Sequence, residues 1–171
     1  VIAAESVKTK LEAMLSGSRV PHALLLYEND GQGGVALSMA LFCRLLGKTP
    51  SEALQAEKLI HPDLVFVFPT AHSKDSTCSL YLPKFRAALT KNPYSTSESI
   101  FSEIGTETKS VSISVSDANE RLVSLSQTPL CGGNRVVFFY LPEKMNQAVA
   151  NKLLKLIEEP PANTYFILLT N

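Results

Sequence analysis

The sequence predicts an α/β protein in which a parallel sheet is covered by helices on both faces. Short, wholly apolar runs alternate with segments whose apolar residues recur at helical spacing, a pattern typical of parallel sheets. The first apolar run is followed by a glycine-rich loop and a long apolar helix, the order in which an α/β nucleotide-binding unit begins. The chain has 171 residues, of which 45% are hydrophobic and 19% are charged. This composition is globular, and one domain with a sizeable core is the default at this length.

Charge and cysteine content exclude several classes of protein. Sixteen Lys and Arg balance sixteen Asp and Glu, so the zero formal net charge gives no general argument for binding nucleic acid or anionic membranes. Cys43, Cys78 and Cys131 lie far apart without a CxxC pair, so we expect small buried side chains in a reducing compartment rather than disulfides. No apolar run reaches the roughly 18 residues of a transmembrane helix, and no signal peptide is recognisable. We therefore expect a cytoplasmic protein.

The first elements are expected to be a helix, a strand, a loop and a second helix. Apolar residues between Val7 and Leu15 recur on one helical face and predict the first helix. Residues 23–27 form an apolar run that suits a strand buried on both faces. Three glycines in four positions mark a loop over 28–34, because glycine permits unusual backbone angles. The segment 35–46 is apolar almost throughout and predicts a largely buried helix.

The rest of the chain continues this alternation. The predicted elements are a helix over 48–59, a strand over 64–68, a loop over 70–79, a helix over 82–90, a helix from an N-cap at Ser116 through Gln127, a turn over 129–134, a strand over 135–140, a helix from an N-cap at Asn146 to Glu158, and a strand over 164–169. The centres of the four strands are predicted to be buried, at residues 24–26, 65–67, 136–138 and 166–168. Residues 92–112 are rich in Ser, Thr and Glu, so we expect a solvated, weakly ordered insertion there.

The glycine loop stands where a P-loop would stand, but its charged groups are missing. A working P-loop reads GxxxxGK[ST]: its backbone N–H groups cradle phosphates, the Lys neutralises them and the Ser or Thr holds Mg²⁺. The loop here contains Gly31, Gly33 and Gly34. Aligned on these glycines, Glu28 takes the first Gly position, Gly34 the Lys position and Val35 the Ser or Thr position. All three changes disfavour nucleotide, although the start of the following helix could still hold a stray anion.

The acidic strand end that supports Mg²⁺ and the attacking water in P-loop ATPases is also absent. After the strand over 135–139, the two positions expected to carry Asp and Glu are Tyr140 and Leu141. Glu143 lies further along the chain and is expected to point elsewhere. We therefore expect no catalytic residue and no bound cofactor, with an ATPase that uses an unorthodox loop as the alternative.

Other polar residues give weaker signals. His61 and Asp63 could ligate a metal, but a turn is the more common role for such a histidine, and we expect no metal. Lys144, Lys152 and Lys155 lie in one region and form either a solvated helical face or a binding patch.

Four segments together carry a resemblance to a known family. They are residues 19–27, the glycine loop, His61-Pro62-Asp63 and residues 142–164. The last of them contains the specific run Asn-x-Leu-Leu-Lys-x-x-Glu-Glu-Pro-Pro at 151–161. The chain resembles the bacterial clamp loaders of the AAA+ family, most closely the delta-prime subunits of DNA polymerase III, and its Pro-Glu-Lys-Met at 142–145 is similar to Bacteroidetes members. The resemblance covers residues 1–69 and 130–171.

This resemblance implies an AAA+ core, a three-layer P-loop NTPase-like fold, as a single domain over residues 1–171 with a divergent insertion around 70–112. It implies a five-membered loader that places the sliding clamp on primed DNA, in which gamma or tau subunits bind and hydrolyse ATP. A delta-prime subunit is a rigid, stator-like end member without hydrolysis, and the loop substitutions fit that member better than an ATPase member of the gamma/tau kind. The expected partners are the gamma/tau and delta subunits, with the clamp and primed DNA reached through the complex and no membrane partner.

The resemblance also implies features at and beyond the end of this sequence. The family's sensor position maps to Thr170 and Asn171. The Ser-Arg-Cys motif, the lid and the C-terminal oligomerisation domain are expected beyond Asn171, so the sequence is interpreted as an N-terminal fragment. ATPase members carry a four-cysteine zinc module after the first helix, and because only Cys43 lies in that region we expect no zinc.

Overall fold

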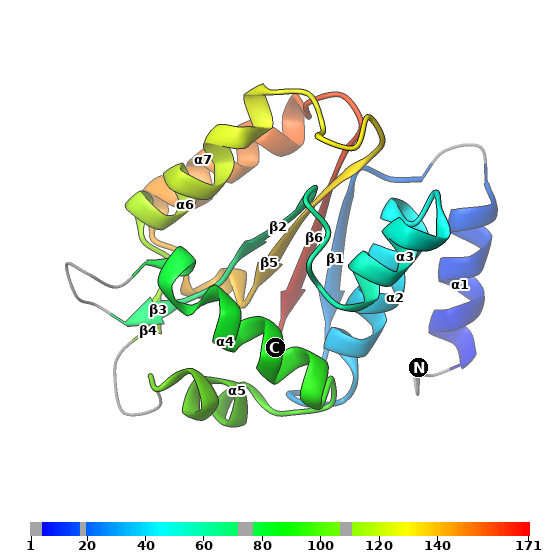
Figure 1. Cartoon of the computed structure of the whole chain (residues 1–171). Coiled ribbons are helices and arrows are strands. Elements are labelled where there is room, and N and C mark those ends of the chain that lie inside the picture. The colour runs from blue at the N-terminus through cyan, green and yellow to red at the C-terminus, as the bar shows by residue number, and fades with distance from the viewer. Residues whose placement is uncertain (1–4, 18–19, 72–76, 107–110) are drawn as a thin grey trace.

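The computed structural model describes residues 5–17, 20–71, 77–106 and 111–171 (Figure 1). Its elements follow in the order α1 (Glu5–Ser16), β1 (Ala23–Tyr27), α2 (Gly34–Leu46), α3 (Pro50–Glu57), β2 (Leu64–Val67), β3 (Thr70–Ala71), α4 (Cys78–Lys91), α5 (Ser97–Ile104), β4 (Val111–Ser112), α6 (Val115–Leu122), the 3₁₀-helix η1 (Val123–Ser126), β5 (Arg135–Tyr140), the 3₁₀-helix η2 (Pro142–Lys144), α7 (Gln147–Glu158) and β6 (Thr164–Thr170). Each predicted strand and helix outside the 92–112 segment is present, with ends shifted by a few residues. None of the helices in these described ranges has the length and apolar character needed to cross a bilayer.

A parallel four-stranded sheet in the order β1-β6-β5-β2 forms the centre of the molecule. Helices α2 to α5 pack on one face and α6 and α7 on the other, so the predicted parallel sheet between two helical layers is confirmed (Figure 1). On the first face Phe42 of α2 meets Phe138 of β5 edge to face, with ring centroids 5.1 Å apart. On the second face Val137 and Phe166 pack in one cluster with Val149 of α7.

The first strand lies at an edge of the sheet, which corrects the prediction that residues 24–26 are buried. Leu25 is 68% exposed and Tyr27 is 74% exposed. Among the described strands, β1 pairs only with β6, and the helices on the face of Leu25 pack over β5 and β6 instead. At the opposite edge Val65 is likewise only partly buried. The order of the strands decides this burial, and an apolar run in the sequence does not reveal that order.

The prediction of a solvated insertion over 92–112 is wrong in part, because α5 packs against α4 and the core. Ile100, Phe101 and Ile104 are at most 8% exposed. The helix keeps most of its serines and glutamates outside the core, so a polar composition conceals a narrow apolar stripe. Residues 107–110 of this segment lie outside the described part of the chain.

Two helices begin earlier than predicted because other residues cap them. Thr77 caps α4, which therefore starts inside the predicted loop over 70–79, of which residues 72–76 lie outside the described ranges. Ser114 rather than Ser116 caps α6, and the helix ends in a 3₁₀ turn in which Leu125 is buried. Neighbouring Ser and Thr residues look alike in the sequence, and the extended backbone before each helix decides which of them becomes the cap.

A buried charged network fixes the amino-terminal edge of the sheet. Asp63 is 1% exposed and Arg135 is 3% exposed, and Asp63 Oδ1 lies 3.8 Å from the Arg135 guanidinium. The Asp63 carboxylate also accepts the N–H groups of Leu130 and Cys131 at 2.7 and 2.8 Å. The Arg135 guanidinium donates to three backbone carbonyls between 124 and 128, at 2.7 to 3.2 Å. The network thus holds the turn before β5 against the residue that precedes β2.

Burial predicts opposite outcomes for two alanine substitutions in the sheet. Val137→Ala removes two methyl groups from a fully buried position and should lower the free energy of unfolding by about 1–3 kcal/mol. Leu25→Ala should change it by less than about 0.5 kcal/mol, because that side chain is largely exposed. Urea denaturation of both variants measures the difference, and equal losses would contradict the strand order.

Removing the Asp63 carboxylate should destabilise the protein strongly. Asp63→Ala leaves the Arg135 charge buried without its partner and two backbone N–H groups unpaired, so we expect a loss of about 3–5 kcal/mol. Glu12→Ala on the exposed face of α1 is the control and should stay within about 0.5 kcal/mol of the wild type. If Asp63→Ala fails to fold, Asp63→Asn replaces it in the same denaturation series. A loss as small as that of the control would argue against the network.

Candidate functional site

The carboxyl ends of the parallel strands bring the candidate site residues to one edge of the sheet. β1 leads into the glycine loop, β5 leads into the 3₁₀ turn η2, and β6 ends at Thr170 beside Asn171. Tyr27 pairs with Thr170, and the end of β5 pairs with Leu169, so these ends lie side by side. Ligands of open α/β sheets bind at this edge, outside the carboxyl ends of the strands.

The glycine loop carries its own anion at the start of α2. Gly31 and Gly33 have positive φ angles of 79° and 107°, which glycine adopts without strain. Gly34 is the first residue of α2, and its N–H donates to Glu28 Oε2 at 2.7 Å. A carboxylate is stabilised at a helix N-terminus by the helix dipole and by a charge-assisted hydrogen bond. The sequence allows a bound anion at the start of α2, and in the structure the Glu28 carboxylate occupies that position.

Gly34 and Val35, which take the places of the P-loop Lys and Ser or Thr, are surrounded by other residues of the protein. A Cβ on Gly34 would lie 2.4 Å from Leu169 Cδ1 and 2.7 Å from Glu28 Cδ, so any side chain there requires both neighbours to move. Val35 is 3% exposed and belongs to the core on the α2 face of the sheet. Neither position presents a side chain to a ligand at the sheet edge.

The glycine loop also contacts α5, which is distant in the sequence. Asp30 accepts the N–H of Ser97 at 2.8 Å and the Ser97 hydroxyl at 2.6 Å. Gly31 lies against the backbone of Tyr94 and the side chain of Thr96, because a Cβ there would come within 3.2 Å of each. Sequence reasoning missed this contact. The local signal was a Thr-Ser pair typical of a helix start, and such a pair does not reveal its tertiary partner.

The end of β5 is buried and carries no carboxylate at the two expected positions. Tyr140 is 2% exposed, and Leu141 is 3% exposed with a φ of 53°. Burial raises the pKa of the Tyr140 hydroxyl, and three nearby carboxylates raise it further. They belong to Asp30, Glu28 and Glu143. The two positions thus offer a neutral phenol and an aliphatic side chain, neither of which supports Mg²⁺.

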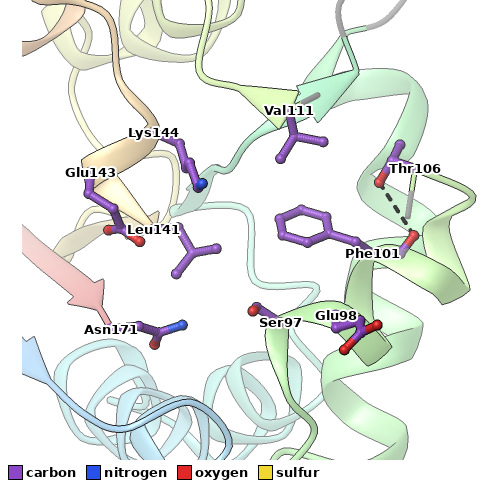
Figure 2. A pocket seen from close by; sticks show the side chains of 9 residues that line it. All are labelled: Ser97, Glu98, Phe101, Thr106, Val111, Leu141, Glu143, Lys144 and Asn171. Carbon is purple, nitrogen blue, oxygen red and sulfur yellow. Dashed lines mark hydrogen bonds between the residues drawn. The ribbon is translucent and has the colours of Figure 1, made fainter. Parts of the chain in front are cut away.

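Glu143 returns to the sheet edge rather than pointing away from it. Thr170 donates its hydroxyl to Glu143 Oε2 at 2.8 Å. A pocket of about 370 Å³ lies between α5 and the turn after β5, and Figure 2 shows the side chains that line it. Its lining residues are Ser97, Glu98, Phe101, Thr106, Val111, Leu141, Glu143, Lys144 and Asn171. Of the two sensor-like residues, Thr170 therefore has a partner within the chain, and Asn171 faces the pocket.

Three side chains of metal-ligating types gather at the opposite edge of the sheet. Glu52, His61 and Cys131 each offer one ligand atom, and these atoms lie within 4.8 Å of one another. His61 Nδ1 accepts the N–H of Asp63 at 3.1 Å, so the neutral ring carries its proton on Nε2. Desolvation and the Asp63 carboxylate raise the pKa of the Cys131 thiol. The Leu64 N–H donates to the His61 carbonyl at 3.1 Å, so His61 and Asp63 lie in a turn, as the sequence predicts.

The cysteines differ in burial, which corrects the expectation that all three are buried. Cys78 is buried, Cys43 is partly buried and Cys131 is exposed. Desolvation raises the pKa of Cys78 to about 12, and Asp117 raises it as well. Cys131 is exposed because the Asp63 carboxylate holds the backbone of its turn and leaves the thiol outside the core.

Two lysines of the region singled out in the sequence, Lys144 and Lys152, lie in different environments. Lys152 donates to Asn119 Oδ1 at 2.5 Å and so joins α7 to α6. Lys144 lines the pocket of Figure 2 instead.

Comparison with known proteins gives consistent matches. The family described as DNA polymerase III, delta subunit, matches residues 3–171. The DNA polymerase III subunit delta' of Haemophilus influenzae is 44% identical over 54 residues, which make up 32% of this chain and 16% of that protein. The corresponding subunit of Buchnera aphidicola subsp. Baizongia pistaciae is 47% identical over 38 residues, 22% of this chain and 11% of that protein. In both pairs the share of this chain is twice that of the relative, so the chain spans about half the length of these relatives.

Proposed function

Because this chain belongs to the family of the DNA polymerase III delta subunit, we propose that it is part of a clamp-loader subunit of the delta-prime kind. Such a subunit helps to load the sliding clamp during DNA replication. The two partial relatives, both named DNA polymerase III subunit delta', support this assignment. Within the loader we propose a stator-like role, in which this subunit binds and hydrolyses no ATP of its own.

The observation that carries the stator role is the hydrogen bond from the Gly34 N–H to Glu28 Oε2. A phosphate at the start of α2 would need this N–H and would meet the carboxylate instead. Two like charges 4 Å apart repel by about 4 kcal/mol at an effective dielectric constant of 20. Because Gly34 supplies no cation to offset this repulsion, the loop is best explained as a degenerate P-loop.

Hydrolysis meets a second, independent obstacle at the end of β5. Phosphoryl transfer needs a metal ion that neutralises the developing charge, and that ion needs oxygen ligands from the protein. The hydroxyl-bearing position of the loop is Val35, and the acidic positions at the strand end are Tyr140 and Leu141. A buried Tyr140 whose pKa is raised stays a neutral phenol, which is a poor ligand for Mg²⁺.

The wider organisation follows from the same family membership. We propose that residues 1–171 form an AAA+ domain whose divergent segment around 70–112 includes α4 and α5. The proposed partners are the gamma/tau and delta subunits of the loader. The sliding clamp and primed DNA would be reached through the assembled complex.

Calorimetric titration with millimolar Mg-ATP tests the stator role, and it should give no saturable heat. The double variant Gly34→Lys with Val35→Thr should not hydrolyse ATP either, because Glu28 and Leu169 crowd the new side chain and Tyr140 and Leu141 leave the metal unsupported. A gamma/tau subunit serves as the positive control. A dissociation constant in the low micromolar range for the wild type would restore the ATPase alternative.

Assembly of the full-length protein tests the clamp-loader assignment itself. The full-length subunit should co-purify with gamma/tau and delta, whereas residues 1–171 alone should bind them weakly, because this chain spans only about half the length of its relatives. Size-exclusion chromatography of the mixed subunits measures both. A tight complex of residues 1–171 with delta would count against this arrangement, and failure of the full-length protein to join gamma/tau and delta would overturn the assignment.

A further inference from the structure

A carboxylate of the glycine loop holds the N-terminus of α5. The Asp30 carboxylate accepts the Ser97 N–H at 2.8 Å through Oδ1 and at 3.0 Å through Oδ2, and Oδ2 also accepts the Ser97 hydroxyl at 2.6 Å. The free N–H groups at the start of a helix carry partial positive charge, so a carboxylate there is stabilising. α5 therefore has a distant cap in Asp30 in addition to its local cap in Thr96.

The same contact places a segment of the chain against the glycine loop. A Cβ on Gly31 would lie 3.2 Å from both Tyr94 O and Thr96 Cγ2, so the loop backbone meets the residues before α5 closely. At Gly31 the loop therefore faces another segment of the protein's own chain. A side chain at position 31 would crowd both neighbours and would have to adopt a positive φ, which glycine adopts without strain.

The other side of α5 is fixed by apolar packing. Ile100 and Ile104 are buried in the core, and the Phe101 ring centroid lies 6.4 Å from that of Tyr140. Ser97 and Phe101 also belong to one wall of the pocket in Figure 2, opposite the turn after β5. The position of the α5 N-terminus therefore sets the width of this pocket.

We propose that Asp30 is a positioning residue that fastens α5 to the glycine loop, so that the loop keeps one conformation without a ligand and α5 forms a fixed wall of the pocket. The inference rests on the proposed function, in which this loop binds no nucleotide. It goes further by assigning the loop a structural task. In nucleotide-binding proteins the corresponding loop binds a ligand. In this chain the glycine loop instead connects the sheet to α5.

Backbone amide hydrogen exchange on the full-length protein tests this proposal. Asp30→Ala should raise the exchange rate in the first turn of α5 by about 10-fold, because a charge-assisted cap is lost, and should leave α7 unchanged. Asp30→Asn keeps an acceptor oxygen but not the charge, so we expect a smaller increase. Glu98→Gln is the comparison variant, because it removes an exposed carboxylate from the first turn of α5 itself. That carboxylate interacts favourably with the helix dipole, so its removal should raise the exchange rate by at most about 5-fold, less than Asp30→Ala does.

The outcomes separate this inference from the proposed function. Unchanged exchange in α5 for Asp30→Ala, or an equal increase for Glu98→Gln, would overturn the role of Asp30 whatever the loop binds. If Asp30→Ala does not fold, Asp30→Asn decides the question by the same comparison with Glu98→Gln. Protection of the wild-type loop by added Mg-ATP would overturn the stator role, while the exchange of the variants without ATP would still report on the fastening of α5.

Discussion

The buried carboxylate of Asp63 is the constraint on which the arrangement of the sheet depends. It faces the Arg135 guanidinium at 3.8 Å and accepts two backbone N–H groups of the turn before β5. Burying a charge is costly unless partners compensate it. Here Asp63, which precedes β2, is the partner of Arg135, the first residue of β5. The register of these neighbouring strands, with Phe66 opposite Phe138, follows from that fixed end. The sheet edge at their far ends is thereby held in place.

At that far edge, three carboxylates each find a hydrogen-bond donor within the chain. Glu28 accepts from the Gly34 N–H, Asp30 accepts from Ser97, and Glu143 accepts from Thr170. A nucleotide site needs the opposite arrangement, with free donors and cations facing a polyphosphate. The negative charges at this edge are therefore used to hold helix starts and a strand end together. This use of charge agrees with the stator-like role proposed above, in which the loop binds no nucleotide.

The family assignment and the local chemistry support each other without depending on each other. The family match spans residues 3–171, whereas the two curated relatives match only short segments. Distances within this chain show that the glycine loop leaves no room for a side chain at position 34. A Cβ added to Gly34 would lie 2.4 Å from Leu169 Cδ1. α5 belongs to the segment where the resemblance is weakest, and it is the element that Asp30 joins to the loop. The proposed stator role thus rests on both the family membership and the contacts within this chain.

Apolar periodicity and residue identity are local properties, so the sequence alone predicted the four strands of the central sheet, the helices outside the 92–112 segment and the missing charges of the loop. It also placed the Asn146 cap correctly. It did not predict the short strands β3 and β4 or the helix α5. Only the tertiary structure decided that β1 is an edge strand with Leu25 exposed, since strand order depends on pairing between distant segments. Likewise, only folding brought Asp30 to Ser97, because a carboxylate and a helix start that are 67 residues apart give no sign in the sequence of meeting.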